Sequence, residues 1–258
     1  MSFDSSHRGG AGPPLLLLHG FTDTWRTWEP VLPALERRFE VLALTLAGHA
    51  GGPGFPADEA IVDAVEAALD APGWEAPAVA GNSLGGFVGL RLAERGRARS
   101  VVALAPAGGW ADGDPAIAAT LRYFRAMSKM VQDAAPRADQ IAATPEGRAA
   151  ASVAYASTAD HLSADLVAHL IRGAAACDAE PLVAFAEREG WRLDPERITC
   201  PVRFVWGTED KILALPGAAA RYRTEFPQAE WVEIEGAGHC PQLDHPVEVA
   251  ELIGGFSG

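Results

Sequence analysis

The chain has 258 residues, 48% of them hydrophobic, which suits one large domain with a substantial core. Its net charge of −13 argues against nucleic acid or an anionic membrane as a partner, because an acidic surface repels polyanions. No stretch approaches the ~20 apolar residues of a membrane span, and residues 1–14 lack the apolar core of a signal peptide. Three cysteines without metal-ligand spacing favour a reduced, cytoplasmic protein that uses neither metal nor cofactor.

The first half of the chain alternates apolar strands with amphipathic helices. Residues 1–12 are polar and glycine-rich and predict a frayed leader. Uninterrupted apolar runs predict buried strands, and apolar residues at helical spacing predict helices. The expected strands are 13–18, 39–46, 77–80 and 100–105, and the expected helices are 24–38, 57–71 and 84–95. This alternation indicates an α/β protein with a parallel sheet and right-handed crossovers.

The alternation stops between Pro106 and Arg197, where no strand is expected. An interruption of this length with secondary structure of its own predicts a helical cap inserted into the sheet domain. The helices expected in it are 115–133, 145–157, 163–177 and 180–189. The elements expected after it are strands 202–206 and 230–234 and helices 216–226 and 247–256. We therefore expect a core of about six strands from residues 1–106 and 198–258, and a cap from residues 107–197.

A pentapeptide between a strand and a helix carries the strongest chemical signal, with Gly81 and Gly85 on either side of Ser83. The pattern G-x-S-x-G in this setting is typical of a nucleophile elbow, which presents a serine hydroxyl at a helix N-terminus. The turn forces the serine into a sparsely populated backbone conformation, and glycines two residues away avoid the resulting clashes. The alternative is an ordinary helix N-cap, because a glycine-rich chain produces such a motif by chance.

Two further strand ends supply partners for this serine. Asp210 follows the expected strand 202–206, and His239 follows the expected strand 230–234. The carboxyl ends of parallel strands meet at one edge of a sheet, so these two side chains are expected to converge with Ser83. Serine, acid and histidine occur in the chain order that this architecture uses for a catalytic triad.

Four segments together resemble the α/β-hydrolase superfamily, in its branch of small capped serine hydrolases: LLLLHGF, GNSLGG, VWGTED and GAGHCPQLDHP. The resemblance covers residues 13–106 and 198–256 and implies the α/β-hydrolase fold. The chain departs from the family pattern after the second strand, where Thr45 replaces an acidic residue and Ala50 replaces a glycine. The family's N-terminal antiparallel hairpin is expected to be missing, since only a dozen residues precede the first buried strand.

The resemblance implies a role for each site residue. Ser83 is the expected nucleophile, His239 its general base, and Asp210 the acid that orients the imidazole. The oxyanion hole is expected at the backbone amides of Phe21 and Leu84.

Several neighbouring residues compete for these roles. Glu209 is an alternative acid to Asp210, although the resemblance favours the second position. His245 is an alternative base that we expect to be structural. His19 is expected to order the oxyanion loop by hydrogen bonding, and Cys240 to be a small buried thiol.

The leading hypothesis is a cofactor-free serine hydrolase of a small or medium carboxylic ester, with an apolar pocket beneath the cap. The candidate pocket residues are Trp25, Trp110, Phe124 and Met127, although core packing explains them equally well. Lactonases, carbon–carbon bond hydrolases and cofactor-independent perhydrolases share the triad, and the sequence leaves them open. Haloalkane dehalogenases and epoxide hydrolases use an aspartate nucleophile, and a long-chain lipase needs an exposed apolar lid, so these are disfavoured.

A receptor that binds a small ligand without turning it over is the hypothesis from a second class. An intact triad argues against it. A purely structural protein is the weakest option, because it would have no use for a strained serine. The sequence does not decide the identity of the substrate or whether the protein is a monomer or a dimer.

Overall fold

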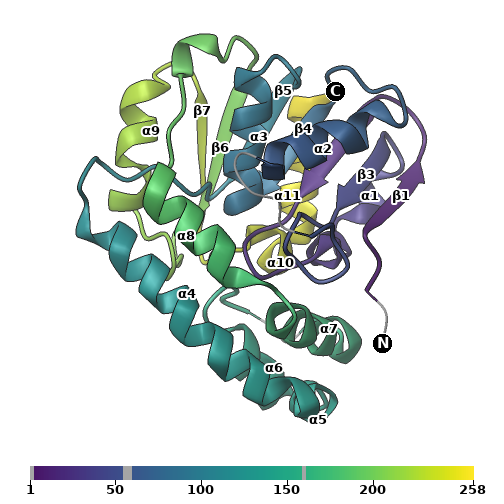
Figure 1. Cartoon of the computed structure of the whole chain (residues 1–258). Helices are drawn as coiled ribbons and strands as arrows, with labels where there is room; N and C mark the ends of the chain where they lie inside the picture. The colour runs from purple at the N-terminus through teal and green to yellow at the C-terminus, as the bar shows by residue number, and fades with distance from the viewer. Residues whose placement is uncertain (1–2, 55–59, 159–160) are drawn as a thin grey trace.

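Figure 1 shows the computed structural model, in which helices flank a twisted sheet and a second group of helices lies together below it. The structure describes residues 3–54, 60–158 and 161–258. Within these residues the sheet has seven strands, in the order β1-β3-β2-β4-β5-β6-β7. They are β1 Ser6–Gly10, β2 Pro14–Leu18, β3 Glu40–Leu44, β4 Ala78–Asn82, β5 Ser100–Leu104, β6 Val202–Gly207 and β7 Glu230–Ile234. Every neighbouring pair is parallel except β1 with β3.

Helices cover both faces of the sheet. The helices before β5 and after β6 are η1 Trp25–Trp28, α1 Leu32–Leu35, α2 Ala60–Asp70, α3 Leu84–Glu94, η4 Gly217–Ala219, α9 Ala220–Glu225, α10 Pro241–Asp244 and α11 Pro246–Ser257. Between β5 and β6 lie the helices here called the inserted helices, followed by the short η3 Pro195–Arg197. The inserted helices are α4 Pro115–Ala134, η2 Ala135–Arg137, α5 Ala138–Ala142, α6 Pro145–Ser152, α7 Ala164–Ala175 and α8 Ala179–Glu189. No helix in the described part of the chain is long and apolar enough to cross a membrane.

The apolar run of β2 shows why the parallel sheet is recognisable in the sequence. Side chains alternate between the faces of a strand, so consecutive leucines serve two separate cores. Leu16 and Leu18 pack in the core that contains residues of α2 and α3. Leu15 and Leu17 pack in the core that contains residues of η1, α1 and α11. All four side chains are fully buried, which confirms the prediction of a strand covered on both faces.

Strand β1 was not expected, and the prediction of a frayed leader is wrong for its residues. Ser6–Gly10 pairs antiparallel with β3, with Ser6 opposite Leu44 and Gly10 opposite Glu40. This edge strand is polar and alternates between exposed and partly buried residues, so it carries no apolar run from which a strand could be predicted. Side chains reinforce the pairing, since the Arg8 Nε donates a hydrogen bond of 2.9 Å to Glu40.

The helix expected at 24–38 is divided into η1 and α1. Pro30 lies between the two helices and Pro33 lies in the first turn of α1. Proline has no backbone N–H to continue a helix, so it is tolerated in a first turn but not in the middle of a long helix. The expected helix 216–226 likewise forms as a short η4 followed by α9.

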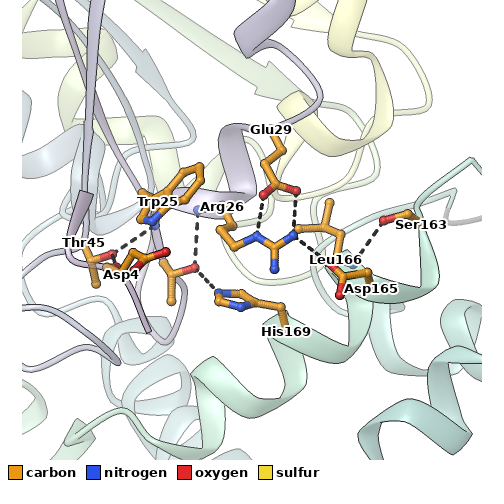
Figure 2. Close-up of polar contacts among 10 residues, drawn as sticks. Asp4, Trp25, Arg26, Glu29, Thr45, Ser163, Asp165, Leu166 and His169 are labelled. Carbon is orange, nitrogen blue, oxygen red and sulfur yellow. Dashed lines mark hydrogen bonds and ion pairs between the residues drawn. The ribbon is translucent and has the colours of Figure 1, made fainter. Parts of the chain in front are cut away.

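Polar contacts join inserted helix α7 to the residues around η1 (Figure 2). Arg26 binds Glu29 on its own segment and donates a 2.7 Å hydrogen bond to Asp165 of α7. The Thr24 hydroxyl lies 2.9 Å from His169 Nε2 and also accepts from the Arg26 backbone amide. Burial, aided by the charge of Arg26, lowers the pKa of His169 to about 4, so this histidine is neutral at pH 7.

Candidate active site

Ser83 occupies a strained turn between β4 and α3. Its backbone φ is 53° and ψ is −114°, a region that a residue with a side chain occupies only where its surroundings enforce it. The two neighbouring glycines make room for the turn. A Cβ on Gly81 would lie 2.2 Å from the carbonyl oxygen of Gly85, and a Cβ on Gly85 would lie 2.2 Å from that of Leu18. The sharp strand-to-helix turn expected from the pattern is therefore present.

Asp210 and His239 form a buried pair at the ends of β6 and β7. The imidazole Nδ1 lies 2.8 Å from Oδ2 of Asp210. The other carboxylate oxygen accepts hydrogen bonds of 2.8 Å from the backbone amides of Ile212 and Leu213. Burial acts to raise the pKa of Asp210, but His239 and these amides outweigh it and lower that pKa. The ionised carboxylate can only accept, so Nδ1 donates to it and Nε2 is the ring nitrogen that faces away from Asp210.

The loop that carries His239 is anchored on both sides. The Asn82 side-chain amide donates a 2.9 Å hydrogen bond to the carbonyl of His239. The Asp244 carboxylate accepts a 2.7 Å hydrogen bond from Gly238, the residue before the histidine, and two more from the backbone amide of Ser157. Sequence reasoning missed Asp244, although the GAGHCPQLDHP segment places it five residues after the histidine. It ties the histidine loop to the inserted helices.

His19 holds the loop after β2 by the hydrogen bonds expected of it. The backbone amide of Leu46 donates to Nε2 at 2.9 Å, so Nε2 is an acceptor and Nδ1 carries the proton. Nδ1 then donates to the Gly20 carbonyl at 2.7 Å. Burial lowers the pKa of His19 well below its ordinary value, so the ring stays neutral. These bonds fix the peptide that leads into Phe21.

A cavity of about 740 Å³ lies between the strand ends and the inserted helices. Ser83 and His239 both line it, together with apolar residues of α4 and α7. Phe124 and Met127, two of the expected pocket residues, are among them. We call this space, bounded by these four residues, the large cavity.

A second space of about 30 Å³ adjoins Ser83 and Leu84. Its other walls include Trp110, Val183 and Leu213, and we call the space bounded by these five residues the small pocket. Trp110, expected in the substrate pocket, lines this space and is not among the residues around the large cavity. Two separate spaces could not be predicted from the residue pattern, because they arise from the packing of α8 and α4 against the core.

Trp25, the fourth expected pocket residue, lines neither space. Its ring stacks on His7 of β1 with centroids 5.1 Å apart. Its backbone amide donates a 3.4 Å hydrogen bond to the Thr45 hydroxyl, which in turn donates to the Asp4 carbonyl (Figure 2). The unexpected edge strand supplies the stacking partner, which explains why this residue was assigned to the pocket in error.

Cys240 and the other thiols show no sign of a reactive role. The Cys240 thiol donates a 3.2 Å hydrogen bond to Asn82, and burial raises its pKa well above the ordinary value. A thiol in this state is not a nucleophile at neutral pH. Among residues 3–54, 60–158 and 161–258, no three histidine, cysteine or acidic side chains gather in a way that would hold a metal ion.

Asp23 is an ionisable residue of the large cavity that sequence reasoning did not single out. One carboxyl oxygen accepts a 2.8 Å hydrogen bond from the backbone amide of Thr24. Burial raises the pKa of Asp23 from 3.8 to about 7. The folded state therefore binds this proton more tightly than the unfolded chain, and stability is lost as the pH rises from about 4 through 7.

We expect Asp23→Asn to remove this loss of stability. Asparagine keeps the hydrogen bond to Thr24 but carries no charge. We compare the free energy of unfolding of the variant with that of the wild type at each pH. The difference should favour the variant by about 1–2 kcal/mol more at pH 8 than at pH 4. This is less than the whole pKa shift of Asp23 would give, because water reaches the cavity wall. Urea unfolding at both pH values measures this, with the exposed Asp112→Asn as control. A difference between variant and wild type that is the same at both pH values would contradict the assignment.

Comparison with known proteins shows the family to which this chain belongs. A model of the Alpha/beta hydrolase family matches residues 15–252. The chain is 31% identical over 199 residues to "Epoxide hydrolase EphH" of Mycobacterium tuberculosis, covering 76% of this chain and 92% of that protein. It is 29% identical over 248 residues to "Pimeloyl-[acyl-carrier protein] methyl ester esterase" of Aromatoleum aromaticum, covering 93% and 96%. A solved epoxide hydrolase from Bacillus megaterium superposes with a TM-score of 0.74 at 18% identity, covering 97% and 95%.

These matches agree with the architecture described above. The family model spans nearly all of the chain from β2 to α11. The solved structure shares the fold at an identity too low to show more. The two relatives are enzymes by their names, one an epoxide hydrolase and the other an esterase of a pimeloyl-[acyl-carrier protein] methyl ester. This protein is therefore a hydrolase that belongs to the α/β-hydrolase family.

Proposed function

We propose that the protein is a serine hydrolase that cleaves carboxylic esters through a covalent acyl-enzyme on Ser83. The observation that carries the proposal is the 2.8 Å pair of Asp210 and His239, whose imidazole lines the same cavity as the strained serine. A serine hydroxyl is a weak nucleophile unless a base removes its proton, and a neutral imidazole oriented by a carboxylate is such a base.

The first half of the reaction forms the acyl-enzyme. The Ser83 oxygen attacks the ester carbonyl carbon while Nε2 of His239 takes the hydroxyl proton. The carbonyl oxygen becomes an anion that accepts hydrogen bonds from the backbone amides of Phe21 and Leu84. As the carbonyl re-forms, the bond to the alcohol oxygen breaks, and His239 gives its proton to the departing alcohol.

The second half regenerates the enzyme. A water molecule attacks the acyl carbon and passes a proton to His239. The bond to the Ser83 oxygen then breaks, the carboxylic acid leaves, and the proton returns to the serine. Asp210 stays ionised throughout, since His239 and two backbone amides lower its pKa, and it stabilises the imidazolium in both halves.

The esterase relative supports ester cleavage more directly than the epoxide hydrolase relative supports epoxide opening. The reason is the nucleophile. A carboxylate that opens an epoxide forms an ester, which water can cleave. Ser83 would instead form an ether, which has no carbonyl for water to attack, so the enzyme would stop after one turnover.

The proposal is tested with a fluorophosphonate probe and a panel of aryl esters. We expect the wild type to be labelled and to hydrolyse the esters, and Ser83→Ala to lose labelling and about 10³–10⁶-fold of kcat. Ser6→Ala, an exposed serine of β1, is the matched control and should keep both. Turnover that survives in Ser83→Ala would overturn the proposal, and ligand binding without any turnover would favour a receptor.

A further inference from the structure

We propose that the ester substrate carries a short acyl group, acetyl or propionyl, which sits in the small pocket, while its alcohol occupies the large cavity. This inference rests on the proposed acyl transfer at Ser83. It assigns each side of the substrate to one of the two spaces that meet at this serine.

The position of His239 decides which side of the ester goes where. The departing alcohol oxygen must receive its proton from the imidazole, so the alcohol lies on the side of His239. His239 lines the large cavity and is not among the described residues around the small pocket. Leu84, whose amide is assigned to the oxyanion hole, lines the small pocket and not the large cavity. The group that stays on Ser83 is therefore directed into the small pocket.

The volume of the small pocket limits the length of the acyl group. Roughly 10–15 Å³ of such space holds one water-sized group, so about 30 Å³ holds about two such groups, which corresponds to the two carbons of propionyl beyond the carbonyl. Leu182 and Val183 of α8 form part of the wall with Trp110 and Leu213, and all four residues are at least 95% buried. Such a wall does not yield readily, because lengthening the acyl group would displace packed residues.

The large cavity, unlike the small pocket, can hold a long group. Two of its lining residues, Met130 and Val153, are 62% and 56% exposed, so this space opens to solvent on the side of the inserted helices. A long alcohol can extend towards this opening. The rings of Phe21 and Phe124 line both spaces and pack edge to face, with centroids 4.8 Å apart. This pair of rings separates the small pocket from the large cavity.

The test is a pair of ester series. One keeps the alcohol, 4-nitrophenol, and lengthens the acyl group from acetyl through propionyl and butyryl to hexanoyl. The other keeps the acetyl group and lengthens a primary alcohol from ethyl to octyl. We expect kcat/KM to fall about 10-fold or more from propionyl to butyryl, since each methylene that does not fit costs about 10- to 200-fold. Across the acetate series, from ethyl to octyl, kcat/KM should change by less than about 10-fold.

Two matched valine variants locate the effect. Val183→Ala enlarges the small pocket and should raise the ratio of butyryl to acetyl turnover about 10-fold. Val131→Ala makes the same change in the wall of the large cavity and should alter only the alcohol series. If Val183→Ala does not fold, the wild-type series alone decides.

The outcomes separate this inference from the proposed function. A kcat/KM that rises with acyl length, or an acyl ratio that responds to Val131→Ala and not to Val183→Ala, would overturn the inference and leave ester hydrolysis standing. Absence of turnover with every ester would overturn both.

Discussion

Asp210→Asn is expected to lower kcat by about 10⁴-fold while leaving the fold intact. An asparagine side chain can keep the hydrogen bonds from the amides of Ile212 and Leu213, which now end on Oδ1 of Asp210. Its NH₂ group would donate to Nδ1 of His239 and leave the ring proton on Nε2. The imidazole could then not accept the proton of Ser83, and a developing imidazolium would lose its counter-charge.

Steady-state kinetics on a good aryl ester measures this effect, and circular dichroism checks the fold. Glu209→Gln is the matched control, because it makes the same carboxylate-to-amide change at the exposed neighbouring position. It should retain activity within about 3-fold, as expected for a surface substitution. Equal losses in the two variants, or none in Asp210→Asn, would show that Asp210 is not the orienting acid.

Gly85→Ala is expected to destabilise the protein by about 3 kcal/mol or more, or to prevent folding. A Cβ at this position would lie 2.2 Å from the carbonyl oxygen of Leu18 and 2.6 Å from that of His19. Both atoms belong to the backbone, so no side-chain rotation relieves the overlap. Movement of this backbone would also displace the loop with the amide of Phe21, so residual activity should fall together with stability.

Urea unfolding measures the change in the free energy of unfolding. Gly255→Ala in α11 is the matched control, because its added Cβ would meet nothing within 4 Å. A glycine-to-alanine change inside a helix should stabilise by about 0.5–1 kcal/mol. The account of the turn around Ser83 would be wrong if Gly85→Ala unfolded at the wild-type urea concentration with full activity.

The sequence predicts the sheet well where burial controls the residue pattern. Strand β2 is an unbroken leucine run because helices cover both of its faces, and that run is visible without a structure. Strand β1 is polar and half exposed, so only its pairing with β3 makes it a strand. Helices η1 and α1 replace the single helix expected at 24–38, because Pro30 interrupts it. Pro30 is visible in the sequence, but the helical spacing of the apolar residues around it favours one continuous helix.

Some features of the candidate site could also be predicted from the sequence, and others could not. Asp210 and His239 could be predicted to meet, because parallel strand ends converge at one edge of a sheet, and the structure brings them to 2.8 Å. The small pocket could not be predicted, because it depends on how α8 packs against α4 and Trp110. The position of Trp25 could not be predicted either, since its partner lies on the strand that the pattern did not reveal.

The carboxylate of Asp244 joins the loop that carries His239 to the segment that follows α6. It accepts hydrogen bonds from the amides of Ser157 and Thr158, beyond α6, and from the amide of Gly238. Any outward swing of the inserted helices that carries residues 157–158 with it must break these bonds or drag His239 away from Asp210. An outward movement during which these bonds hold would therefore break the Asp210–His239 pair, on which the proposed mechanism depends.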